Sequence, residues 1–359
     1  MFVQSRTTLK GCAMEALFGI EYPIVQGPFG GGLSSVALAA AVSNAGGLGS
    51  FGAHILTPEE ITALVADLRR HTDRPFAVNL WVPQPGEDGW PDPHELAGHI
   101  DRIRPYLDEL GLPDPEPTRG PDFVEQVTAL LAAAPPVISF VMGVPPADVL
   151  TEARDRGIRT IGTATTVDEA VAIAEAGMDA VVASGSDAGG HRGAFLRPVA
   201  ESLVGTFSLI PQVRDAVRIP VIAAGGIADA RGIAAARALG ADGVQIGTGF
   251  LTTTESGASA VHKAALLSQA AKVTVLTRLF SGRHARTIPN RLTRELAEHE
   301  ALVPHYPVQS LLMSPIRRSG NADFVNLWSG QAAPLSQSVS AKEYFESLIR
   351  PSGPTKDTD

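Results

Sequence analysis

Cysteine is almost missing from this sequence. Cys12 is the one cysteine among 359 residues, so the chain cannot close a disulfide on itself, and a metal site made of several thiolates is excluded. This cysteine usage fits a reducing compartment, and we expect the protein to be cytoplasmic.

Long apolar runs and basic clusters are missing as well. No stretch approaches the roughly 18 consecutive apolar residues of a membrane-spanning helix, and the segment MFVQSRTTLKGCAMEALFG lacks the apolar centre of a secretory signal. The 38 acidic residues outnumber the 29 lysines and arginines, and the formal net charge is -9. We therefore expect neither nucleic acid nor a membrane as the main partner, but a small molecule, and an oligomer is possible.

Short runs rich in Val, Ile, Phe and Ala alternate along the chain with longer amphipathic segments. The eight runs are PIVQGPF, LGSFGA, FAVNLWV, VISFVMG, RTIGTA, AVVASGS, PVIAAGG and GVQIGTGFL. They are apolar at nearly every position, which is typical of parallel strands buried on both faces. The helical segments carry capping residues such as Ser34, Thr57 and Asp229 at their starts, and Gly157 and Gly240 at their ends. Units of this kind, repeated eight times, predict an α/β fold of the TIM (β/α)8 barrel type rather than an open doubly wound sheet.

Two segments do not fit the repeat. Residues 83–120 are rich in Pro, Gly and Asp around one amphipathic helix, and we expect an excursion after the third strand. The barrel, with this excursion, is expected to span residues 1–271. Residues 272–350 predict a helical lid over the barrel mouth, and PSGPTKDTD at 351–359 predicts a disordered tail.

The loops after the seventh and eighth strands are candidates for a binding site, because reactive groups of TIM barrels gather at the carboxyl ends of the strands. AAGGIAD and QIGTGFL place Gly225, Gly226, Gly247 and Thr248 there. Glycine lets backbone N–H groups approach a ligand closely, and the helix that begins near Asp229 adds its positive end. These loops predict a phosphate site; the alternative is that the glycines only form tight turns.

Two amides end otherwise apolar strands. Gln26 follows the first strand and Asn79 lies in the third, and an unpaired amide is costly to bury. We expect both to face the barrel mouth and to bind something polar and planar, so that the site takes a phosphorylated heterocycle. The alternative is that neighbouring backbone groups satisfy them.

The stretch ASGSDAGGHRGAF holds His191 on a glycine-flanked loop after the sixth strand. Histidine titrates near neutrality, so His191 at the barrel mouth is a candidate general base. Histidines on predicted helices or polar linkers, such as His71 and His299, are not expected to be catalytic. In HELAGH, His94 and His99 would lie about 140 degrees apart around a helix. They could not bind one metal ion together, as histidines at i and i+4 can, so we expect no metal site.

These motifs, in this order, resemble the FMN-dependent nitronate monooxygenases, also known as 2-nitropropane dioxygenases. The resemblance runs through PIVQGPFGGGLSS, AAAVSNAGGLGSFGA, SGSDAGGHRGAF, IPVIAAGGIADARGI and ADGVQIGTGFL, and continues through LTRLFSGRHARTIPN and LWSGQ. It implies a flavoprotein oxidoreductase that oxidises alkyl nitronates or nitroalkanes with O2 to carbonyl compounds and nitrite. It also implies that His191 is the catalytic base.

The resemblance extends to the cofactor. The positions expected to bind FMN are Gln26, Gly27, Pro28, Phe29, Asn79, Ser184, Gly185, Asp187, Gly189, Gly190, Ala224, Gly225, Gly226, Gln245, Gly247 and Thr248. The sequence departs from the family at two of them, with Phe29 where methionine is frequent and Asp187 where glutamate is usual. Neither change removes a donor or acceptor that the chemistry needs.

Other functions are compatible with the same barrel. NADH-dependent enoyl-acyl carrier protein reductases and NADH:quinone reductases carry a similar GGH loop, and a non-catalytic flavin-binding protein is a further alternative. Arg283 and Arg286, in SGRHARTIPN, follow the barrel. They are expected to guide an anionic substrate or to pin the lid; the alternative is a surface ion pair of little energetic consequence.

Overall fold

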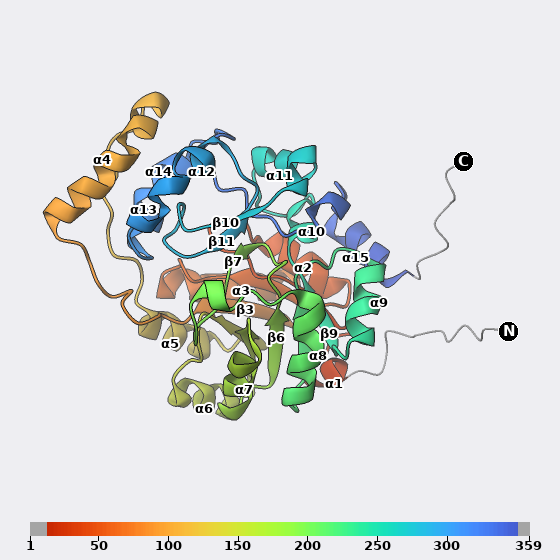
Figure 1. Cartoon of the computed structure of the whole chain (residues 1–359). Coiled ribbons are helices and arrows are strands. Elements are labelled where there is room, and N and C mark those ends of the chain that lie inside the picture. Colours follow the sequence, from red (N-terminus) through yellow and green to blue (C-terminus); the bar gives the residue numbers. More distant parts are fainter. Residues whose placement is uncertain (1–12, 351–359) are drawn as a thin grey trace, which may run out of the picture.

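The predicted strands pair in parallel and close into a barrel (Figure 1). The computed structural model describes residues 13–350, so Cys12 and the expected tail at 351–359 lie outside the described residues. The barrel strands are β1 (Ile24–Gln26), β2 (Gly49–Gly52), β3 (Phe76–Trp81), β4 (Val137–Val141), β5 (Arg159–Ala164), β6 (Ala180–Ser184), β8 (Val221–Ala224) and β9 (Gly243–Ile246). Their order is β1-β9-β8-β6-β5-β4-β3-β2, and a parallel bridge between Val25 and Leu48 joins the ends. The TIM barrel expected from the repeat is confirmed.

Helices cover the outside of the barrel. They are α2 (Val36–Asn44), α3 (Pro58–His71), α5 (Phe123–Ala133), α6 (Ala147–Asp155), α7 (Val167–Glu175), α8 (Thr206–Ala216) and α9 (Ala230–Ala238). Thr57 and Asp229 cap α3 and α9 as predicted. The expected cap at Ser34 is wrong by one residue, because Ser35 caps α2. The Ser34 hydroxyl instead accepts a hydrogen bond from the backbone N–H of Phe29 at 3.0 Å, so it stabilises the loop after β1.

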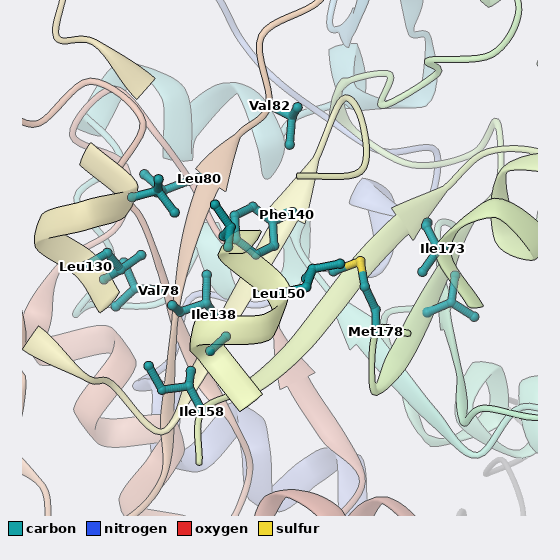
Figure 2. Close-up of a cluster of buried hydrophobic side chains, with 14 of the residues drawn as sticks. Val78, Leu80, Val82, Leu130, Ile138, Phe140, Leu150, Ile158, Ile173 and Met178 are labelled. Atoms are coloured by element: carbon teal, nitrogen blue, oxygen red, sulfur yellow. The ribbon is translucent and has the colours of Figure 1, made fainter. Parts of the chain in front are cut away.

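Strand side chains alternate between two cores. Those that point outward pack under the helices, and Figure 2 shows part of this cluster, including Leu80, Leu130 and Phe140. Those that point inward fill the barrel, and α1 (Ala13–Phe18) covers its amino-terminal end with Met14 and Phe18. Because the interior is packed, open space remains at the carboxyl ends of the strands.

The lid combines the excursion with the C-terminal segment. Helix α4 (Pro93–Leu110) packs beside α13 (Val308–Leu312) and α14 (Ser314–Arg318) through a separate core that includes Tyr106, Phe280 and Phe324 (Figure 1). The remaining short helices are η1 (Val199–Glu201) before α8, α10 (Thr248–Leu251) after β9, and, farther along the chain, α11 (Ala260–Leu266), η2 (Gln269–Lys272), α12 (Arg291–Glu295), η3 (Ala297–Leu302) and η4 (Ala333–Leu335).

Two features of the C-terminal segment differ from a purely helical lid. Strands β10 (Val275–Thr277) and β11 (Ala285–Thr287) form a small antiparallel sheet with β7 (Gly190–His191). Helix α15 (Ala341–Ile349) packs against α2 and α9 on the outside of the barrel, where the Tyr344 hydroxyl donates to the Ala228 carbonyl at 2.7 Å. The small sheet therefore ties the His191 loop directly to the lid.

Candidate functional site

A cavity of about 790 Å3 lies between the carboxyl ends of the strands and the lid. Most of the residues expected at a site line it: Gly27, Pro28, Phe29, Asn79, Ser184, Gly189, Gly190, His191, Ala224, Gly225, Gly226, Gln245, Gly247 and Thr248. The exceptions are Gln26, Gly185 and Asp187. The loops at the carboxyl ends of the strands, although far apart in the sequence, therefore meet at one cavity, as expected for a TIM barrel.

The two amides are placed differently. Gln26 is fully buried, and its side chain accepts from the backbone N–H of Ser50 at 2.9 Å and donates to the Gly27 carbonyl. Gln26 therefore does not face the cavity, because backbone groups already satisfy its amide. Asn79 does line the cavity, and its Nδ2 donates to the carbonyl and hydroxyl of Ser139.

Gly185 and Asp187 shape the loop after β6 without lining the cavity. A Cβ on Gly185 would lie 2.1 Å from the Thr206 hydroxyl oxygen, so only glycine fits there. The Asp187 carboxylate accepts from the backbone N–H of Thr206 at 2.8 Å. Both residues therefore hold the loop against the start of α8.

Four glycines of the cavity have a conformation or surroundings that suit glycine. Gly225 and Gly226 have φ angles of 106° and 69°, and Gly190 has a φ of 71°, a region that favours glycine. A Cβ on Gly190 would meet no atom within 4 Å, and one on Gly247 would meet only Phe29, at 3.6 Å. Gly190 and Gly247 therefore present open backbone to the cavity, whereas a Cβ on Gly225 would lie 2.7 Å from the Thr206 hydroxyl oxygen. Open backbone of this kind suits a flat ligand with a phosphate.

His191 lies at the centre of this arrangement. Its Nε2 shares a hydrogen bond of 2.8 Å with the Ser281 hydroxyl, and its ring contacts Trp81 and Trp328. Burial first, and then the charge of Arg283, lower the pKa of His191 well below its usual value. The imidazole is therefore neutral near neutral pH, the state that can accept a proton.

His54 is a second histidine of the cavity, and sequence reasoning did not single it out. It follows β2 and stacks on Trp81, with ring centroids 3.7 Å apart. A Cβ on Gly30 would lie 2.0 Å from the His54 ring, so the loop after β1 leaves a notch for it. Burial and the Arg283 charge lower the pKa of His54 to about 3. Its position at a strand end was the signal that could have identified it.

The two arginines expected near the mouth have other partners. Arg283 forms an ion pair with Glu87, from the excursion, and its guanidinium lies over the rings of Trp81 and Tyr306, 5.0 and 4.5 Å from their centroids. Arg286 donates to the Ser186 carbonyl at 2.9 Å. Since its charge is already paired, Arg283 is suited to join the excursion to the lid.

Between residues 13 and 350, no group of three or more His, Cys, Asp or Glu side chains could hold a metal ion. Over the same range, no helix has the length and apolar character needed to cross a membrane.

Known proteins resemble this chain over nearly its whole length. A probable nitronate monooxygenase of Staphylococcus saprophyticus is 39% identical, over 94% of this chain and 96% of the relative. The crystal structure of a nitroalkane oxidase from Streptomyces ansochromogenes, also 39% identical, superposes with a TM-score of 0.85 over 93% of this chain and 96% of that one. FabK from Thermotoga maritima is 31% identical, with a TM-score of 0.73 over 94% of this chain and 95% of its own. The sequence model for nitronate monooxygenase matches residues 12–350, and the chain belongs to that family.

Proposed function

We propose that this protein is an FMN-dependent nitronate monooxygenase that oxidises alkyl nitronates and nitroalkanes with O2 to carbonyl compounds and nitrite. The observation that carries the proposal is the position of His191, which lines the same cavity as the glycine backbone after β8 and β9. The family membership and the similarity to a nitroalkane oxidase support it.

The residues present fit FMN. Gly225, Gly226, Gly247 and Thr248 would hold the phosphate, and Pro28 and Phe29 would lie against the ring system. The sequence offers no second glycine loop for a pyrophosphate and adenosine, so we favour FMN over FAD. Bound FMN supplies the electron chemistry of the oxidation and the reaction with oxygen.

His191 supplies the proton chemistry. With a neutral nitroalkane as substrate, the α C–H bond breaks, the proton moves to the imidazole, and the electron pair stays on the substrate as the nitronate anion. A pre-formed nitronate has no such proton to lose. Ser281 holds the ring in place through Nε2, and Trp81 and Trp328 exclude water from its edges.

Two measurements on the purified protein test the proposal. Mass spectrometry of the heat-released cofactor should identify FMN, and recovery of FAD as the main species would overturn that assignment. Nitrite release and oxygen uptake should follow the addition of propyl-2-nitronate. A flavoprotein that forms no nitrite from any small nitronate would refute the proposed activity.

The NADH-dependent reductases are a second candidate, because FabK also aligns over nearly the whole chain. Its identity and TM-score are lower than those of the nitroalkane oxidase, so the reductase reading is the less favoured one. A non-catalytic flavin-binding protein is less favoured still, since His191 is intact. Rapid oxidation of NADH by the protein, without activity on nitronates, would establish the reductase.

A further inference from the structure

The charges that line the cavity contrast with those of the whole chain. The protein has a formal net charge of -9, yet the described residues around the cavity include Arg317 and Arg318 and no Asp or Glu. His54 and His191 also line the cavity, and their lowered pKa values keep both rings neutral. The fixed charge of the cavity is therefore cationic, and α14 supplies it.

Arg317 is the more buried of these arginines, while Arg318 is exposed at the rim. Arg317 Nη2 donates to the carbonyl and hydroxyl oxygens of Ser310, at 3.2 and 3.3 Å. Its Nε is buried and has no hydrogen-bond partner among the described residues. No carboxylate within residues 13–350 forms an ion pair with it. Arg283, by contrast, is paired with Glu87.

Arg317 is half-buried, and a cation that is largely withdrawn from water without a counter-ion is costly, so proteins normally pair such a charge. The charge of Arg317 reaches the centre of the site, because it contributes to the lowered pKa of both His54 and His191. An anion bound in the cavity would supply the missing partner and would occupy the free donors of the guanidinium.

We infer that Arg317 binds the anionic nitronate group of the substrate and is the residue that favours the nitronate over the neutral nitroalkane. This inference rests on the proposed function. The two oxygens of a nitronate form a planar, negatively charged edge, which matches the planar donors of a guanidinium. The neutral histidines cannot balance that charge. Arg283 and Arg286, expected from the sequence to guide the anion, are occupied by other partners.

The test compares Arg317→Gln with Arg294→Gln, which removes the same charge from an exposed position on α12 that does not line the cavity. Arg317→Gln should lower kcat/KM for propyl-2-nitronate by about 10- to 100-fold, the usual effect of losing a charge-assisted hydrogen bond. It should change kcat/KM for neutral 2-nitropropane much less. Arg294→Gln should have little effect, since exposed charges interact weakly across water. Equal losses in both variants, or no loss in Arg317→Gln, would overturn the inference.

A binding measurement separates this inference from the proposed function. Nitrate is a planar oxyanion that the enzyme cannot oxidise, and its binding can be followed through the absorbance of the holoprotein. Its dissociation constant should rise in Arg317→Gln and be partly restored in Arg317→Lys, because lysine keeps the charge but not the planar donors; partial recovery also shows that the site still folds. Weakened nitrate binding in a protein that oxidises no nitronate would refute the proposed function but keep the anion site. Unchanged nitrate binding would overturn the anion site.

Discussion

His54 lies flat on Trp81, with the ring planes 4° apart and the centroids separated by 3.7 Å. The guanidinium of Arg283 also lies over Trp81, 5.0 Å from its ring centroid, and over Tyr306. This column joins the end of β2, the end of β3 and the lid across the cavity. Ring stacking and one guanidinium therefore join three separate segments around the site.

The pH dependence of stability should reveal His54. Its pKa in the folded protein is lowered to about 3, whereas the unfolded chain takes up that proton near the ordinary value of about 6.5. Stability is therefore greatest above about pH 6.5 and is lost as the pH falls from there toward 3. His54→Phe keeps a flat ring but cannot titrate. Between pH 7.5 and 5.5, the free energy of unfolding, measured with urea, should therefore fall less in this variant than in the wild type. The exposed His94→Phe is the control, and a wild-type pH slope in His54→Phe would contradict the prediction.

Glu87→Gln should destabilise the connection between excursion and lid. Both Arg283 and Glu87 are largely buried, so removing one charge leaves the other without its counter-ion, at a cost of about 2 to 3 kcal/mol. The matched control is Glu109→Gln, because its ion pair with Arg291 is exposed and should contribute less than about 1 kcal/mol. Equal losses in the free energy of unfolding in Glu87→Gln and Glu109→Gln would mean that the buried ion pair stabilises the protein no more than the exposed one.

Gly190→Ala tests the space for the flavin. Gly190 and Gly157 have nearly the same φ, 71° and 73°, and a Cβ on either would meet no atom within 4 Å. Both alanine variants should therefore lose about 1 kcal/mol of stability from backbone strain. Gly190 lines the cavity, whereas Gly157 follows α6, so only Gly190→Ala should lower the flavin-to-protein absorbance ratio. Full flavin occupancy in Gly190→Ala would place the cofactor elsewhere.

His191→Asn should separate the two substrate forms. Turnover of neutral 2-nitropropane should fall by about 10²- to 10⁴-fold, the usual contribution of a general base. Oxidation of pre-formed propyl-2-nitronate should suffer less, because that proton is already gone. Steady-state rates at matched flavin occupancy measure the difference. If the variant keeps wild-type activity on the neutral nitroalkane, His191 is not the base.

The strands and the strand-end loops were predictable, because their signals are local. Continuous apolar runs define buried parallel strands, and the barrel rule then brings Gly225, Gly247 and His191 to one mouth. The placement of Gln26 was not predictable, since an amide at a strand end can bond to backbone or to a ligand. Strands β10 and β11 are three residues each, too short to show a periodicity. Arg317 has no local signal at all, because only the packing of α14 over the cavity gives its charge a role.

The most direct test of the account is anaerobic mixing of the purified protein with propyl-2-nitronate and, separately, with NADH, followed by flavin absorbance. The account predicts prompt flavin reduction by the nitronate and little or none by NADH, with nitrite formed once oxygen is admitted. Rapid bleaching by NADH together with no response to the nitronate would contradict it and identify the protein as a reductase.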